Sequence, residues 1–108
     1  MKQYNLIMKW DYNYDKEGTW FDEDNGIVSY ILQENTHFTL PHSIKKRVEV
    51  RKVEVIDGVA TAEIYVDYST YIVTSGAEPV VAHASESYSV AGDCVDKSWV
   101  LEFSIELA

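Results

Sequence analysis

A chain of 108 residues is the size of one domain, and its 46 % hydrophobic content is enough to bury a core, which excludes intrinsic disorder. Because phosphate binding needs basic residues, the formal net charge of −9 argues against nucleic acid as a direct ligand. The same charge favours encounter with basic partners. A single cysteine, Cys94, excludes an intrachain disulfide. We see neither a signal peptide nor the roughly 20 consecutive apolar residues of a membrane span, so we expect a cytoplasmic protein without membrane contact.

The first predicted element is a long strand. Apolar and polar residues alternate from position 4 to position 14, which is typical of a strand with one buried face. The residues expected on that face are Tyr4, Leu6, Met8, Trp10, Tyr12 and Tyr14. Asp15 and Gly18 then stand at the first and last positions of a type I turn, and a second short strand is expected over residues 19–22.

Residues 22–35 allow two interpretations. Asn25-Gly26 is the strongest two-residue hairpin signal in the chain, and it would pair Phe21 with Tyr30. Residues 27–33 are β-branched and aromatic enough to form the strand that follows this turn. The acids at the start of the segment also fit the first turn of a short helix, so a hairpin and a helix both remain open.

A second hairpin is predicted around Asp57-Gly58. In its register Arg51 would fall on the apolar face, and one extra residue near Arg51, a β-bulge, restores the alternation. The alternation after the turn persists through Tyr68 and Ile72, which predicts one long, bent strand.

The remaining residues predict two more strands. A turn is expected over residues 74–79, a strand from Val80 to Val90, a loop over residues 92–97 and a final strand that begins near Trp99. The whole chain, residues 1–108, is therefore expected to be one mainly β domain of about seven or eight antiparallel strands in a hairpin-rich meander, with at most one short helix. A β-sandwich and a partly closed β-barrel both fit this pattern.

No group of residues specifies a reaction, a cofactor or a metal. A calcium-loop pattern of Asn13, Asp15, Glu17, Gly18 and Asp24 is incomplete, because its last position lacks the bidentate Glu and no helices flank it. The three histidines lack zinc-ligand spacing, and the alternating serines after residue 83 lack the orienting group of a catalytic triad. Consecutive acids at a turn are usually solvated rather than catalytic. We predict a protein that is not an enzyme and has no catalytic, cofactor-binding or metal-binding residues.

Residues 45–52 form a basic strip with a net charge of +4. The alternation sets Arg47 opposite Asp67 and Lys52 opposite Glu63, so we expect internal pairing of these charges. Contact with phosphate or with an acidic protein is the alternative, and protection of a strand edge by lysines is another.

The opposite charge gathers in residues 10–25, where six acids and one lysine give a net charge of −5 among several aromatic residues. Exposed aromatics beside acids are typical of an interface for an arginine-rich partner. Alternation buries most of the aromatics before position 15, which leaves a shorter tract beyond it. The predicted partner-binding residues are Trp20, Phe21, Asp22, Glu23, Asp24, Asp15 and Glu17.

These observations predict a small, acidic, non-enzymatic protein that docks on a basic surface of a protein partner. An inhibitor, an immunity protein or a phage-encoded antagonist of a nucleic-acid-handling enzyme fits, with acids in the place of phosphates. Two alternatives remain: a small-ligand or carbohydrate-binding domain that uses Trp10 and Trp20, and a structural subunit that pairs through a strand edge, which would make a homo-oligomer.

Overall fold

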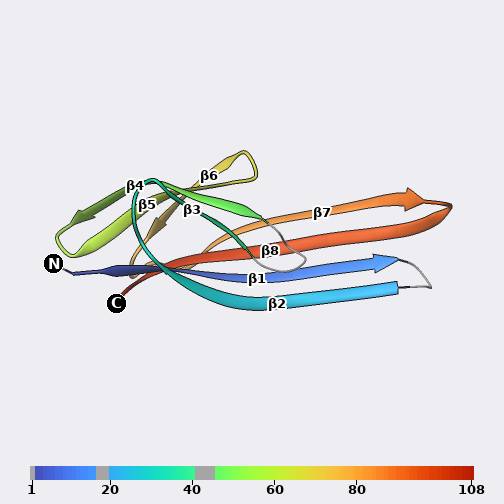
Figure 1. Cartoon of the computed structure of the whole chain (residues 1–108), viewed down its shortest axis with the longest axis horizontal. Coiled ribbons are helices and arrows are strands. Elements are labelled where there is room, and N and C mark those ends of the chain that lie inside the picture. The colour runs from blue at the N-terminus through green and yellow to red at the C-terminus, as the bar shows by residue number, and fades with distance from the viewer. Residues whose placement is uncertain (1, 17–19, 41–45) are drawn as a thin grey trace.

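The chain folds into two antiparallel sheets (Figure 1). The computed structural model describes residues 2–16, 20–40 and 46–108, with the backbone alone for residues 20–22 and 90. Over these residues the structure has eight strands and no helix. One sheet has the strand order β2-β1-β8-β7 and the other β3-β4-β5-β6. Because the sheets stay separate, the predicted β-sandwich is confirmed and no barrel closes.

The strands of the first sheet are much longer than those of the second. The first sheet contains β1 (Tyr4–Lys16), β2 (Trp20–Ile31), β7 (Val80–Val90) and β8 (Asp93–Leu107). The second sheet contains β3 (Thr36–Thr39), β4 (Arg47–Ile56), β5 (Val59–Val66) and β6 (Ser69–Thr74). A residue adds about 3.3 Å to a strand, so the first sheet runs well past the second and the molecule measures 56 × 22 × 22 Å (Figure 1).

One hydrophobic cluster fills the space between the sheets. Alternate residues of β1 supply the predicted buried face from Tyr4 to Tyr12, and Tyr14 packs against the cluster while partly exposed. From the opposite side, Val48, Val50, Ile64 and Val66 are buried on β4 and β5. The period-2 pattern of the sequence therefore identified the core face of the first strand correctly.

Two contacts mark the ends of the overlap between the sheets. The Tyr4 hydroxyl donates to the carbonyl oxygen of Gly58 at 2.8 Å, which fixes the β4–β5 turn above the start of β1. At the other end the Lys46 Nζ lies 4.8 Å from the centroid of the Trp99 ring. Past this end of the overlap the first sheet continues without the second (Figure 1). We call this extension the arm, and it comprises residues 13–16, 20–23, 85–90 and 93–98.

The predicted turn at Asn25-Gly26 is wrong, and so is the helical alternative for residues 22–35. Both residues lie within β2, where Gly26 pairs with Trp10 and Tyr30 pairs with Leu6 rather than with Phe21. A Cβ at position 26 would lie 2.4 Å from the Trp10 Cζ2 atom. The glycine therefore makes room for an indole ring instead of reversing the chain.

The predicted turn at Asp57-Gly58 is confirmed, as is the β-bulge between Val50 and Lys52. The long strand expected after the turn is wrong, because β5 ends at Val66 and the chain reverses at Asp67-Tyr68, with φ values of 50° and 67°. Both positive angles are typical of a type I′ hairpin turn, but neither residue is a glycine, so the sequence carried no turn signal there.

The loop predicted over residues 92–97 is also wrong. The β7–β8 turn consists of Ala91 and Gly92 alone, both with positive φ, and β8 begins at Asp93. The type I turn predicted from Asp15 to Gly18 lies partly outside the described residues, and Asp15 itself belongs to β1.

Candidate protein-binding face

The predicted partner-binding residues lie along the hairpin of β1 and β2 at the tip of the arm. In the register of the two strands, Phe21 is opposite Asp15, Asp22 is opposite Tyr14 and Trp20 is opposite Lys16. Glu17 lies outside the described residues. The structure thus brings the backbones of the described candidates together at one end of the molecule.

Strand alternation nevertheless divides these candidates between two faces. We call the face of the first sheet that is turned toward the second sheet the inner face, and the opposite one the outer face. Glu23 is exposed on the outer face, opposite Asn13, whereas Asp24 is partly buried on the inner face, opposite Tyr12. The predicted acidic tract is therefore not one continuous surface.

The outer face of the arm gathers acids from three strands. Asp15 on β1, Glu23 on β2 and Asp96 on β8 are all exposed there, and Asp11 lies two outer-face positions before Asp15, nearer the body of the molecule. Asp15 and Asp96 are direct cross-strand neighbours, an arrangement of like charges that destabilises a sheet. Sequence reasoning missed Asp96 because it assigned residues 92–97 to a loop. Continuing the alternation of β8 backward from Trp99 would have found it.

The basic residues of the arm lie on its inner face. Among the described residues of the arm these are Lys16 and Lys97. The Lys16 Nζ lies 3.4 Å from a carboxylate oxygen of Asp93, and the Lys97 Nζ lies 5.9 Å from the centroid of the Tyr12 ring. The described part of the arm consequently presents acids and no lysine or arginine on its outer face.

A serine orients one of these acids. The Ser87 hydroxyl donates to the Oδ1 atom of Asp96 across β7 and β8. Ser87 shares the outer face of β7 with His83, Ser85 and Ser89, all of them exposed. The hydroxyl of Ser87 is thus bonded to a carboxylate, which holds Asp96 in place on the outer face.

A shallow hollow of about 530 Å³ adjoins these acids on the outer face. Its lining combines two carboxylates and one lysine with exposed aliphatic groups. The lining residues are Lys9, Trp10, Asp11, Asn25, Gly26, Ile27, Val100 and Glu102.

Two tyrosines interact on the inner face of the arm. Loss of hydration raises the pKa of Tyr88 above its ordinary value, and a hydrogen bond with Tyr14 and the negative charge of Glu86 raise this pKa further. These rings continue the aromatic row of β1 past the end of the second sheet, so the inner face of the arm combines aromatic rings with charged side chains.

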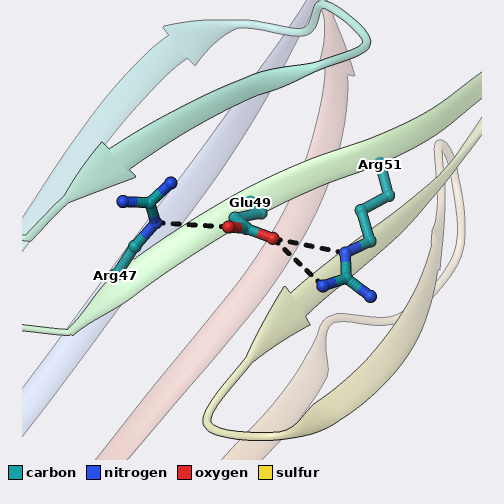
Figure 2. Close-up of polar contacts among 3 residues, drawn as sticks. All are labelled: Arg47, Glu49 and Arg51. Atoms are coloured by element: carbon teal, nitrogen blue, oxygen red, sulfur yellow. Dashed lines mark hydrogen bonds and ion pairs between the residues drawn. The ribbon is translucent and has the colours of Figure 1, made fainter.

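The basic strip lies on the second sheet, and acids of the same chain compensate it. Figure 2 shows Glu49 between two arginines: its Oε1 accepts from the Nε of Arg47 at 3.2 Å, and its Oε2 accepts from the Nε and Nη2 of Arg51, each at 3.2 Å. The Arg51 guanidinium carbon also lies 3.6 Å from the centroid of the Tyr65 ring. These contacts compensate both arginines with one carboxylate and hold the Arg51 guanidinium against the Tyr65 ring.

The two described lysines of the strip are paired as well. Lys46 lies 3.0 Å from Asp67 and Lys52 lies 3.4 Å from Glu54. The register of Lys52 opposite Glu63 is confirmed, but the predicted pairing of Arg47 with Asp67 is wrong, because Asp67 lies in the β5–β6 turn within reach of Lys46. Internal pairing, as predicted, accounts for each described cation of the strip.

The other candidate groups lie apart from one another. His37 is exposed on β3 and His83 on β7, and His42 lies outside the described residues. Among the described residues, no three His, Cys, Asp or Glu side chains come together in a way that could hold a metal ion. Trp10 and Trp99 are only 5 % and 7 % exposed, so neither presents a ring face on which a sugar would stack.

Within the described residues there is no helix with the length and apolar character needed to cross a membrane. Neither the models of known protein families nor the curated proteins contain a match to this chain.

Proposed function

We propose that this chain is a small acidic binding protein that docks on a basic surface of a protein partner through the outer face of its arm. The observation that carries the proposal is the sorting of charge on the arm. Asp15, Glu23 and Asp96 are exposed on the outer face, while Lys16 and Lys97 lie on the inner one.

Electrostatics favours a cationic partner at this face. Asp15 and Asp96 repel each other in the free protein, and a guanidinium or ammonium group between them would relieve that repulsion. The net charge of −9 would also accelerate encounter with a basic surface. The compensated arginines of the second sheet offer no comparable excess of charge.

The neighbouring hollow supports the same chemistry. Ile27 and Val100 are exposed in it beside Asp11, while Lys9 lies directly opposite Glu102. A long basic side chain could lay its aliphatic stem on the two apolar residues and bring its charge to Asp11. An enzyme with a basic nucleic-acid-binding groove is a partner of this kind, and the acids would then occupy phosphate positions.

The proposal is tested with an arginine-rich peptide as the probe. In the variant Asp15→Asn, Glu23→Gln, Asp96→Asn, the net negative charge falls by three units, all of them on the outer face. The matched control Glu54→Gln, Asp57→Asn, Glu78→Gln removes the same charge from exposed positions elsewhere. We expect calorimetry at low salt to show at least about tenfold weaker binding for the arm variant than for the control. Equal affinities of the two variants would show that net charge alone attracts the probe and would overturn the proposal.

The native partner is sought by comparative affinity capture from the source cells. A true partner is retained by the wild-type protein and by the control variant, is lost with the arm variant, and is released as salt screens the interface. Proteins that all three baits retain would bind a surface other than the outer face of the arm. If raising the salt concentration released none of the captured proteins, docking by charge would be contradicted.

A further inference from the structure

The four edges of the two sheets differ in how they are protected against pairing with another strand. The edge strands of the second sheet, β3 and β6, are short, with 4 and 6 residues. In the first sheet, the β2 edge carries three consecutive acids, Asp22 to Asp24. Short strands and charged residues are the usual protections of a sheet edge. The fourth edge, β7, is long and has one charged residue, Glu86.

The β7 edge is long, regular and nearly uncharged. Its 11 residues pair with β8 without a register shift, from Val80 opposite Phe103 to Val90 opposite Asp93. The strand contains no lysine, arginine or proline, and Glu86 is its only acid. Residues 83–89 are all exposed. The backbone groups on the open side of β7 are therefore accessible to another strand.

We infer that two copies of this chain pair through β7 in antiparallel fashion, with Ser85 opposite Ser85 of the second copy. This register is self-complementary. On one face Tyr88 meets Ala82 and Glu86 meets Ala84, so each large side chain lies beside a small one. On the other face His83 meets Ser87, and the two Ser85 hydroxyls meet at the twofold axis.

Charge also selects this edge and this register. Two molecules with a net charge of −9 repel each other, and β7 is the long edge on which they meet with the fewest charges. A shift of the twofold axis by one residue to Glu86 would set the two Glu86 carboxylates directly opposite each other. Centred on Ser85, each Glu86 instead faces a methyl group.

The resulting dimer has a continuous eight-stranded sheet. A twofold axis perpendicular to the sheet keeps the outer faces of both copies on the same side. Two acidic arms would therefore face one partner surface, and the dimer would bind a basic partner with two equivalent sites. Pairing through β7 does not depend on the proposed docking function.

The first test is the mass in solution. Sedimentation equilibrium of the wild-type protein should show a rise from 12.4 kDa toward twice that mass as concentration increases. Ser85→Lys sets two ammonium groups opposite each other at the axis and should return the protein to a monomer. The matched control, Ser29→Lys, adds the same charge to an exposed outer-face position on the β2 edge and should leave the dimer intact. A wild-type monomer up to millimolar concentration, or a dimer that Ser85→Lys does not weaken, would overturn the inference.

The second test reads the register and needs no charge substitution. In a Cys94→Ser background, Ser85→Cys places two thiols side by side at the axis, and a short bis-maleimide should join the two chains. Ser89→Cys places its two thiols about 27 Å apart, since they are separated by eight positions of about 3.4 Å each, and it should not be joined. Efficient joining through position 89, or none through position 85, would contradict this pairing.

Discussion

At the scale of single residues, the close approach of Trp10 and Gly26 shows how one packing contact determines a secondary structure. An Asn-Gly pair favours a tight turn in isolation. Here Gly26 lies opposite Trp10 on the neighbouring strand, and the indole ring occupies the volume that a Cβ at position 26 would take. Burial of a tryptophan contributes more than a turn propensity of a few tenths of a kcal/mol, so β2 continues through the pair.

Gly26→Ala should destabilise the protein by about 1–3 kcal/mol, the usual cost of overpacking a filled site. The new methyl group would lie 2.4 Å from the Trp10 Cζ2 and 2.5 Å from its Cη2, and the ring is too buried to move away. Urea denaturation measures this change. Ser29→Ala, an exposed position on the same strand, is the control and should change the free energy of unfolding by less than about 0.5 kcal/mol. Unchanged stability of Gly26→Ala would mean that the indole does not occupy this space.

The tyrosine pair of the arm predicts a dependence of stability on alkaline pH. The folded state raises the pKa of Tyr88 and so favours the neutral phenol. Its contribution is fully present below the ordinary tyrosine pKa of about 10 and is lost as the pH rises through the folded-state pKa. Tyr14→Phe removes the hydrogen bond and should lower the pKa of Tyr88. Difference titration of phenol absorbance against Tyr88→Phe measures it, and an unchanged titration in Tyr14→Phe would contradict the assigned hydrogen bond.

At the scale of elements, three two-residue turns connect hairpins within the described residues, and in each of them both central residues have a positive φ. Two of them use glycine at the second position, Gly58 and Gly92. The third uses Tyr68, whose φ is 67° and whose side chain is 93 % exposed. A bulky residue in this region is strained, and the exposed ring of Tyr68 gains little burial in return.

Tyr68→Gly should therefore stabilise the protein by about 0.5–1 kcal/mol, after the greater freedom of glycine in the unfolded chain is subtracted. A substitution in the opposite sense, Gly58→Ala in the Asp57-Gly58 turn, should destabilise the protein by about 1 kcal/mol. No atom lies within 4 Å of the added methyl group, so the strain of the positive φ is the cause of this loss. Thermal unfolding measures both. A loss of stability in Tyr68→Gly would mean that the ring contributes contacts of its own.

At the scale of the whole molecule, the unequal lengths of the two sheets determine the shape, and the shape separates the charges. Where the sheets overlap, the second one supplies cations that acids of the same chain neutralise. Beyond the overlap, the arm has two solvent-facing sides. Alternation then places both described lysines of the arm on the inner side, with Asp93 and Glu86, and leaves the outer side with acids as its only charges.

The extended arm predicts a large radius of gyration for a chain of this size. A compact domain of 108 residues would have a value near 13 Å, whereas the structure has 16.1 Å. Small-angle X-ray scattering of the Ser85→Lys variant at low concentration should return the larger value without a contribution from dimers. A value near 13 Å would show that the arm folds back on the body in solution.

Local patterns were sufficient for much of the fold. The alternation of β1, the Asp57-Gly58 turn and the bulge at Arg51 could all be predicted, because each depends on neighbours in the sequence or on one register. The predictions failed where a distant residue decided the local structure. Gly26 stays in a strand because the Trp10 ring packs against it. The Asp67-Tyr68 turn was missed for another reason, since it contains no glycine to indicate a turn.

The sequence by itself determined that the chain is acidic and mainly β, with a core built from the alternate residues of its strands, because hydrophobic periodicity and charge are properties of the chain alone. The choice between a sandwich and a barrel depended on strand pairing, which gives two separate sheets. Only the tertiary structure decided which acids share a face. Asp15 and Asp96 stand 81 positions apart in the chain and become neighbours through the pairing of β1 with β8. Asp24, next to Glu23 in the sequence, turns to the opposite side, because successive residues of a strand point to opposite faces.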